Sequence, residues 1–274
     1  VDNISIKLAE QDRSVNGNGL QVFGTVTKTA VATGADLVAY SGFSSSNYLQ
    51  QPYNSDLDFG TGDFCITFWA KILTSGDCSF LHLAPNLTSS NPATGIHLWT
   101  YGGYFKANAG GAELTSQNAN SPFPASSGAV FNHVVVGRTG GKGFYYLNGL
   151  KQVTNENNTG SIGSTSNSLY IGEGFYGNTA SNLALLRISA TAPSAEQIAK
   201  IYNDEKPLFQ ENAQATLYGT SDAVTALAYD DDTELLHAGT SAGRSVFQGL
   251  RRVENTTDAV GAAISASNGL VAED

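Results

Sequence analysis

The chain has 274 residues, of which 41% are hydrophobic and 14% charged, and its formal net charge is −10. This length can bury a sizeable core and fits one large β domain with an appendage. The acidic excess argues against nucleic acid as a partner and against tight binding of an anionic glycan without a bridging cation, because few Lys and Arg are available to meet negative charge. Since no apolar run approaches about 20 residues, membrane insertion is not expected. Methionine is absent even at position 1, so Val1 is expected to begin a fragment or a processed product.

Short strands between Gly-rich turns are predicted from the N-terminus onward. A turn at 16–19 precedes a strand at 20–23. The strongest strand signal covers 63–72, where Phe64, Ile66 and Phe68 alternate with Cys65, Thr67 and Trp69. Both faces of this segment carry bulky side chains. It is therefore predicted to be a central strand, packed on both sides.

Cys65 and Cys78 are the only cysteines. They flank an expected turn at 75–76, but a hairpin centred there would pair Cys65 with a residue near position 85. Two buried free thiols are therefore favoured over a disulfide, which stays open as the alternative.

Further strands are expected at 79–83, 95–101, 104–107, 131–138, 143–147, 168–172 and 183–189. Asn148-Gly149 is the clearest two-residue hairpin turn, because a type I′ turn needs a positive φ at both central positions. About ten short strands at this spacing are typical of a sandwich or jelly roll.

One helix is predicted after these strands. Ser194 is its N-cap, Gln197 completes a capping box, and Pro207 ends it. Beyond Pro207, strands are expected at 224–229 and 235–238, within a total of about four between 208 and 274. Four short strands are too few to close a core, so this segment should dock on the sandwich or assemble with copies of itself. We therefore divide the chain into a sandwich at 1–206 and a β-rich oligomerisation segment at 207–274.

Three blocks carry a family resemblance: LDFGTGDFCITFWAK at 57–71, NHVVVGR at 132–138 with YYLNG at 145–149, and LYIG at 169–172 followed by Leu186-Arg187-Ile188 and the helix. In this order they resemble the concanavalin A-like, laminin-G-like jelly-roll family over about residues 15–206. The resemblance implies an all-β antiparallel sandwich with one short helix. The stretch Asp12-Arg13-Ser14 and the Gly-Thr-Ser segments near the C-terminus also resemble bacteriophage tail-fibre and tailspike proteins. That resemblance implies an extracellular place on a virion.

Calcium-binding members of this family carry carboxylates just before the last strand, but Ala184 and Leu185 occupy the matching positions here. No cofactor is therefore expected, and calcium would need another site. Asp230 and Asp232 are the remaining metal-ligating candidates. A solvated hairpin turn is the favoured interpretation of the acidic run that contains them.

Catalysis is not expected. Glycosidases of this fold use a close carboxylate pair, commonly in an E-x-D-x-x-E run, and the sequence contains no such run. All four histidines, at positions 82, 97, 133 and 237, lie in strand patterns, where a structural role is the default.

Sugar-binding surfaces combine flat aromatic faces with polar loops, and two places fit this description. Trp99, Tyr101 and Tyr104 surround the Gly102-Gly103 turn, and Phe175, Tyr176 and Asn178 lie in an aromatic Gly-rich loop. Rings that cap the sandwich core are the competing interpretation. The polar loops at 86–94 and 117–127 would suit a binding rim.

The leading hypothesis is a non-enzymatic recognition module at the tip of a phage fibre, contacting a host glycan or protein. It predicts a homotrimer joined through residues 208–274. One alternative is a structural virion component, such as a decoration or collar protein. Another is a polysaccharide-degrading enzyme.

Overall fold

The computed structural model describes residues 9–10, 16–73, 77–115, 123, 130–152, 157–177, 181–214, 216–220, 223–249 and 251–274. The chain divides into two compact units. The first, here called the sandwich unit, comprises residues 1–29 and 39–199. The second, the C-terminal unit, comprises residues 200–274 together with the segment 30–38.

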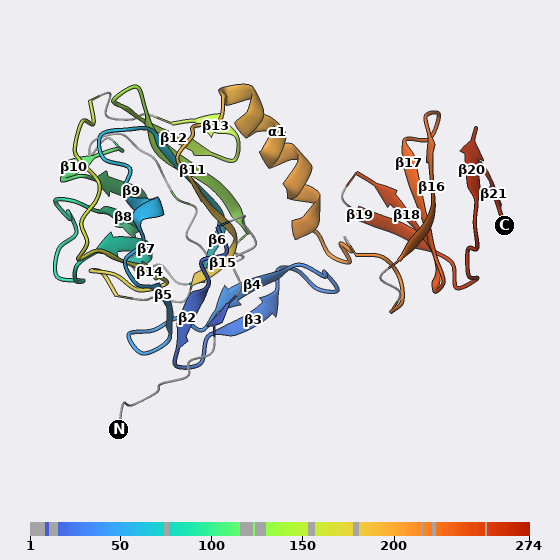
Figure 1. Cartoon of the computed structure of the whole chain (residues 1–274), viewed down its shortest axis with the longest axis horizontal. Helices are drawn as coiled ribbons and strands as arrows, with labels where there is room; N and C mark the ends of the chain where they lie inside the picture. The colour runs from blue at the N-terminus through green and yellow to red at the C-terminus, as the bar shows by residue number, and fades with distance from the viewer. Residues whose placement is uncertain are drawn as a thin grey trace. The chain divides into compact units, whose positions relative to one another are not determined.

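Two antiparallel sheets form the sandwich unit (Figure 1). Sheet A has eight strands in the order β1 (Ala9–Glu10), β2 (Leu20–Phe23), β5 (Tyr48–Gln51), β14 (Ser168–Ile171), β7 (Cys78–Ala84), β8 (Ile96–Tyr101), β9 (Tyr104–Ala109) and β10 (Ala112–Glu113). Sheet B has seven, in the order β13 (Leu150–Lys151), β12 (Lys142–Leu147), β11 (Asn132–Thr139), β6 (Phe64–Ile72), β15 (Ser181–Ser189), β4 (Val38–Ser41) and β3 (Thr27–Ala30). The predicted all-β sandwich is confirmed.

Strand β6 is the central strand that its sequence predicts. It lies between β11 and β15, and only Thr67 and Lys71 along it are not buried. On its core side, the Phe68 ring lies 5.4 Å from that of Phe80 and 6.5 Å from that of Phe105, both on sheet A. These contacts join the two layers of the sandwich through Phe68. Burial of each of these side chains stabilises the fold by about 1.5–3 kcal/mol.

Cys65 and Cys78 are buried free thiols, as favoured. The expected turn at 75–76 lies outside the described residues. Strands β6 and β7 belong to different sheets, so they do not form the hairpin that the sequence suggested. The chain passes from one layer of the sandwich to the other between the two cysteines.

The hairpin of β12 and β13 turns at Asn148 and Gly149, whose φ angles are 52° and 78°. This is the type I′ geometry expected from the Asn-Gly pair. Asn148 also accepts a hydrogen bond at Oδ1 from the backbone N–H of His133, 2.9 Å away. The turn residue thereby fastens the hairpin to the start of β11.

Helix α1 (Ala195–Glu205) begins with the predicted capping box. The N–H of Ser194 donates to Gln197 Oε1 at 2.8 Å, and the N–H of Gln197 donates to Ser194 Oγ at 3.3 Å. Ile198 is buried against Cys65, Val135 and Phe144, which lie on the outer face of sheet B. The 3₁₀ turn η2 (Lys206–Phe209) follows, with Pro207 at its start. A short 3₁₀ turn, η1 (Ser55–Leu57), lies earlier in the chain. Among the described residues, no helix is long and apolar enough to cross a membrane.

The described residues of the C-terminal unit form six strands rather than the four expected. Strands β16 (Val224–Asp230), β17 (Leu235–Thr240), β18 (Gly243–Gln248) and β19 (Arg251–Asn255) form one antiparallel sheet in chain order, and β20 (Ile264–Ser267) pairs with β21 (Leu270–Glu273). The unit also encloses buried apolar residues of its own: Ala213, Ala238, Val246, Phe247 and Val260. Because the last strands have polar ends and are joined by short turns, their alternation of apolar and polar residues is not evident in the sequence.

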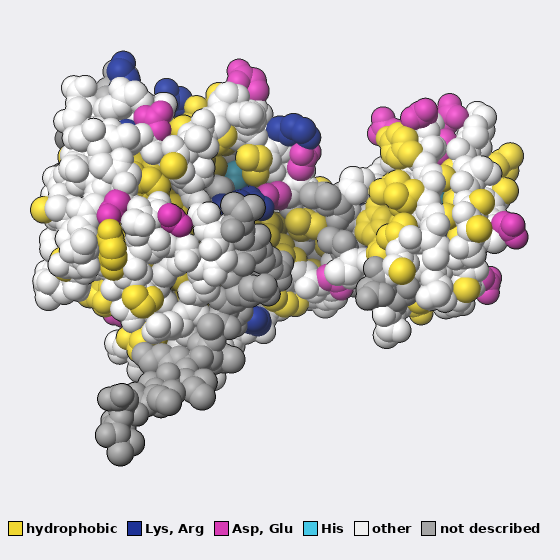
Figure 2. All heavy atoms as spheres, in the orientation of Figure 1, with side chains coloured by type: hydrophobic (Ala, Val, Ile, Leu, Met, Phe, Trp, Pro, Cys, Tyr) yellow, Lys and Arg dark blue, Asp and Glu magenta, His cyan; other side chains and the backbone are white. Residues whose placement is uncertain are grey.

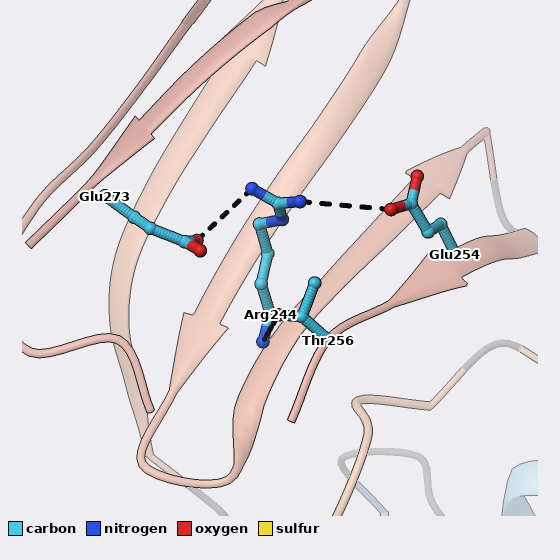
Figure 3. Close-up of polar contacts among 4 residues, drawn as sticks. All are labelled: Arg244, Glu254, Thr256 and Glu273. Atoms are coloured by element: carbon cyan, nitrogen blue, oxygen red, sulfur yellow. Dashed lines mark hydrogen bonds and ion pairs between the residues drawn. The ribbon is translucent and has the colours of Figure 1, made fainter. Parts of the chain in front are cut away.

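Gly239 and Arg244 hold the β20–β21 hairpin against the four-stranded sheet. A Cβ on Gly239 would lie 2.7 Å from Val260 Cβ and 3.0 Å from Ile264 Cδ1. Because Gly239 has no side chain, Val260 and Ile264 can pack directly against the backbone of β17. Arg244 lies 3.2 Å from Glu273 of β21 and 4.0 Å from Glu254 of β19 (Figure 3). One guanidinium therefore joins three strands.

Candidate functional site

The outer face of sheet A carries a row of polar and aromatic side chains. Across successive strands the register pairs Gln50 with Tyr170, Tyr170 with His82, His82 with His97, and His97 with Asn108. The residues that alternate with them, such as Leu83 and Leu98, belong to the core. The row therefore lies on the face of the sheet turned away from the core.

Two rings of this row stack with two neighbouring rings, and we call the four together the aromatic ladder: His82, His97, Trp99 and Tyr176. The centroids of His82 and His97 lie 4.3 Å apart, as do those of His97 and Trp99, with the latter planes only 12° apart. Tyr176, from the loop after β14, stacks on Trp99 at 5.8 Å and on His97 at 6.1 Å. The two places singled out in the sequence thus meet in one cluster.

The outer end of the ladder is exposed to solvent. The Tyr101 ring lies 5.4 Å from Tyr176, and the Phe175 ring meets Tyr176 edge-on at 4.9 Å. Tyr101 is 52% exposed, Phe175 43% and Tyr104, which pairs with Tyr101 across the β8–β9 hairpin, 39%. Trp99, by contrast, is only 5% exposed. The buried indole contacts Tyr176, and Tyr176 in turn contacts the exposed rings of Tyr101 and Phe175.

Asn178, the remaining candidate of the sequence analysis, lies outside the described residues, as does most of the predicted rim at 117–127. The other predicted rim loop, at 86–94, is described and contributes directly. The carbonyl oxygen of Ser90 lies 3.1 Å from His97 Nδ1 and accepts a hydrogen bond from Asn108 Nδ2 at 3.1 Å. This loop therefore anchors the buried end of the ladder.

Hydrogen bonds at His97 fix the loop that carries Tyr176. A carbonyl oxygen can only accept, so His97 Nδ1 donates to Ser90, and Nε2 of the neutral ring accepts. Ser79 Oγ, 3.0 Å from Nε2, is then the donor to His97, and it accepts from the Tyr176 N–H at 3.3 Å. A relay of three residues thus positions the Tyr176 ring over Trp99.

Gly174 is required for this arrangement. A Cβ at this position would lie 2.5 Å from Ser79 Cβ and 3.2 Å from His97 Nε2. Contacts of that length force a shift of the loop or of strand β7. The first glycine of the pattern Gly-Phe-Tyr-Gly is therefore needed because the loop backbone lies close to the sheet. The sequence shows the glycine, but it does not show which strand the loop approaches.

The deep end of the ladder is neutral. Burial lowers the pKa of His82 from 6.5 to about 4. Burial, with a smaller contribution from His82, lowers the pKa of His97 to about 3. Both side chains are wholly buried. Neither ring nitrogen of His82 has a hydrogen-bond partner among the described residues, and the same holds for Trp99 Nε1, so stacking holds these rings in place.

Two acidic residues border the cluster in sequence. Asp77 accepts a hydrogen bond at Oδ1 from the Gly102 N–H at 3.0 Å, which fixes the turn beneath Tyr101 and Tyr104. Glu173 precedes the aromatic loop and is 7% exposed. The pKa of Tyr48 is raised mainly by burial, then by Tyr170 and least by the Glu173 carboxylate. The cluster offers flat apolar ring faces beside polar groups, which suits binding of a sugar ring.

The metal-ligating candidates Asp230 and Asp232 lie in the C-terminal unit and make hydrogen bonds there. Asp230 Oδ2 accepts from the Gly269 N–H at 2.7 Å, and Asp232 Oδ2 accepts from the Asn268 N–H at 3.2 Å. The pKa of Asp230 is lowered: burial alone would raise it, but hydrogen bonds from the amides of Gly269 and Asp232 outweigh that effect. Within the described residues, no group of three or more His, Cys, Asp or Glu could hold a metal ion.

Residues 43–199 match the model of the concanavalin A-like lectin/glucanases superfamily. The chain belongs to this superfamily. Its matched segment contains both halves of the aromatic ladder, and the resemblance drawn from the three sequence blocks is confirmed. No curated protein matches the sequence significantly.

Solved structures share the fold at low sequence identity. The binding domain of Paraclostridial Mosquitocidal Protein 1 is similar at a TM-score of 0.55 and 15% identity, with 86% of this chain and 62% of that one covered. The binding domain of Botulinum Neurotoxin DC, in complex with SialylT, is similar at 0.52 and 12%, with 94% and 64% covered. A structure of botulinum neurotoxin type C, a toxin whose cell entry depends on interaction with two ganglioside molecules, is similar at a TM-score of 0.52 and 13% identity, with 94% of this chain and 63% of that one covered. The chain thus spans less than two thirds of these structures.

Proposed function

We propose that this superfamily member is a non-enzymatic recognition module that binds a cell-surface glycan through Tyr101, Tyr104 and Phe175. The observation that carries the proposal is the aromatic ladder. Two segments from distant parts of the chain bring their rings together: the exposed Tyr101 and Phe175 both contact Tyr176, which stacks on the buried Trp99. Tyr104 is exposed beside them, because it pairs with Tyr101 across the β8–β9 hairpin. Exposing rigid rings costs free energy that a ligand's apolar face would recover.

Two further facts support a glycan as the ligand. The superfamily is named for lectins and glucanases. Among the similar structures, one is a complex with SialylT and another concerns ganglioside binding. Their identity to this chain is low, so these facts guide the choice of ligand class and the test, and the site itself is argued from the ladder.

A glycan array followed by titration tests the proposal. Tyr101→Ser and Phe175→Ser should each weaken binding of the best glycan by about tenfold, with melting temperatures close to wild type, because both side chains are exposed. Leu150→Ser is the matched control, since Leu150 is 70% exposed on a hairpin of sheet B. Unchanged affinity in both aromatic variants would contradict the assignment of the site.

Catalysis is tested separately with the same glycans and with bacterial capsule and lipopolysaccharide. The proposal expects no release of reducing ends. Release that persists in a preparation purified to constant specific activity would replace the non-enzymatic assignment with that of a polysaccharide-degrading enzyme.

We further propose that the module acts outside the cell, at the tip of a bacteriophage tail fibre, as a homotrimer joined through the C-terminal unit. An exposed apolar group supports the assembly: Leu227 is 60% exposed, Tyr229 54% and Leu236 36%, and Tyr229 pairs with Leu236 across β16 and β17. Hydrophobic side chains also gather on the surface of this unit in Figure 2. Such a surface is typical of a protein contact.

Light scattering after size exclusion tests the assembly. The proposal expects a trimer for the whole chain and a monomer for Leu227→Asp, whereas a monomeric wild-type chain would contradict it. Competition with phage adsorption to host cells tests the fibre assignment. A chain that docks on virions but neither competes nor binds glycans would instead be a structural virion component.

A further inference from the structure

A polar pocket of about 390 Å³ lies at the free edge of strand β19 in the C-terminal unit. Residues 251–255 form one wall, and Asn212 and Gln214 form the other. The Arg252 N–H donates to the carbonyl oxygen of Gln214, which joins the two walls. Among the described residues of the lining, Val253 is the one apolar side chain and the other six are polar or charged, which suits a hydrophilic ligand of monosaccharide size.

Two arginines line this pocket, and the Nε atom of each is buried without a hydrogen-bond partner among the described residues. Arg252 is bonded through its other two guanidinium nitrogens, whereas the half-buried Arg251 side chain has no such bond to a described residue. No ion pair joins it to any described residue. A partly desolvated guanidinium with unused donors favours a carboxylate, which it can bind through two parallel hydrogen bonds.

The neighbouring charges do not neutralise Arg251. Arg252 is held by the Thr216 carbonyl oxygen at 2.9 Å, by the Gln214 side chain and by the Tyr218 ring, which lies 5.6 Å from the guanidinium carbon. Glu254 is turned toward Arg244, 4.0 Å away (Figure 3). The pocket therefore holds two cations. Arg252 is fixed by these contacts although its Nε has no partner, and Arg251 is the one whose terminal guanidinium nitrogens are bonded to no described residue.

We propose that this pocket binds a carboxylate-bearing monosaccharide, as found in sialic and uronic acids, with Arg251 receiving the carboxylate. The amides of Asn212 and Asn255 would meet its hydroxyl groups. The net charge of −10 opposes acidic ligands at long range. At physiological ionic strength, however, screening over about 8 Å leaves the local arginines dominant. The site lies outside the superfamily segment 43–199 and does not depend on the aromatic ladder.

Titration of the isotope-labelled whole chain, followed by NMR, tests the inference. N-acetylneuraminic acid and glucuronic acid should each shift the Arg251 Nε–H signal and the side-chain amide signals of Asn212 and Asn255. Glucose and the methyl ester of glucuronic acid should not. Binding should also weaken as salt rises, because the contact is between charges.

Variants assign the binding to Arg251. Arg251→Gln should lose at least about tenfold in affinity. Arg187→Gln, which removes an exposed arginine of the sandwich unit, is the control and should bind as wild type. Asn255→Asp, at an exposed position, adds a like charge at the pocket and should weaken binding without affecting the fold. Tyr101→Ser should leave this binding intact, which separates the result from that of the aromatic site.

Three results would overturn the inference. One is equal shifts with glucose, which would show that the carboxylate is not recognised. The second is wild-type affinity in Arg251→Gln. The third is equal binding of inorganic phosphate, which would make the pocket an unspecific anion site.

Discussion

The imidazole of His97 lies against the indole of Trp99, with centroids 4.3 Å apart and planes 12° apart. The same imidazole is hydrogen-bonded to Ser79 on one nitrogen and to the Ser90 carbonyl on the other. One buried ring thus connects strand β8, strand β7 and the 86–94 loop, and supports the exposed aromatic residues. Its charge state therefore bears on both stability and the binding surface.

Stability of the sandwich unit should fall in mild acid. The unfolded chain binds protons at histidine near pH 6.5, whereas burial lowers the folded pKa of His82 to about 4 and that of His97 to about 3. The stabilisation is complete above about pH 6.5 and is lost as the pH falls through the folded pKa values, about 4 for His82 and about 3 for His97. Each histidine contributes a slope of about 1.4 kcal/mol per pH unit. Denaturant unfolding at several pH values measures it.

His82→Phe removes one of the two titrating imidazoles, so it measures the contribution of His82 to this pH dependence. The aromatic ring can keep the stacking on His97, and no hydrogen bond is lost, because neither nitrogen of His82 has a partner among the described residues. The variant should be at least as stable as wild type near pH 5 and should show a shallower pH dependence. A slope equal to that of wild type would show that His82 titrates normally in the folded protein.

Gly174→Ala should weaken glycan binding more than it weakens the fold. The added methyl would lie 2.5 Å from Ser79 Cβ, so the loop that carries Phe175 and Tyr176 has to move. Gly177→Asn is the control in the same loop, because a Cβ there meets nothing within 4 Å and Asn tolerates the φ of 66° better than other side chains. Loss of affinity only in Gly174→Ala, measured beside melting temperature, is the expected result. Equal affinity in both variants would show that loop position is unimportant.

Arg138→Lys should destabilise the sandwich unit by about 2–4 kcal/mol, because acceptors are left unpaired in the interior. Arg138 is wholly buried and donates hydrogen bonds to the carbonyl oxygens of Gly60, Gly62 and Gly160 and to Asn158 Oδ1. A lysine ammonium has three donors and cannot reach this spread of acceptors. Urea unfolding measures the change, with the exposed Arg187→Lys as control. A difference below about 1 kcal/mol would contradict the role assigned to Arg138.

Asp230→Asn should loosen the β20–β21 hairpin. The carboxylate accepts from the N–H groups of Gly269 and Asp232, and the lowered pKa means that this stabilisation is present at neutral pH and lost as the pH falls through the folded pKa. Hydrogen exchange at the Gly269 amide should be faster in the variant. Millimolar calcium or a chelator should leave the melting temperature of the wild type unchanged. A rise with calcium that disappears in Asp230→Asn would instead make this turn a cation site.

The central part of the fold could be predicted from sequence because its signals are local. Alternation along β6, the Asn148-Gly149 turn and the Ser194–Gln197 capping box each act within a few residues, and each is confirmed. The sequence predicts too few C-terminal strands because the stability of these strands depends on contacts distant in sequence. Asp230 with Gly269 and Arg244 with Glu273 are examples that no local pattern reveals.

The aromatic residues of the candidate site were identifiable by type, but not their arrangement. Phe175 and Tyr176 follow β14, whereas Trp99 and Tyr101 belong to β8, and β7 lies between these two strands in sheet A. Strand order alone places them together, and strand order is a property of the whole fold. His82 and His97, assigned a structural role in the sequence, are the rings on which the cluster rests.

Residues 30–38 interrupt the sandwich sequence but belong to the C-terminal unit. The Thr33 carbonyl oxygen accepts from the Asn212 N–H at 2.7 Å, the Asp36 N–H donates to Ala213 at 2.8 Å, and Asp36 Oδ2 accepts from Thr216 Oγ1 at 2.6 Å. A truncation after residue 206 would remove Asn212, Ala213 and Thr216, the hydrogen-bond partners of this segment. Gene fragments designed at a single boundary would therefore damage both halves, and the units are better studied by substitution than by separation.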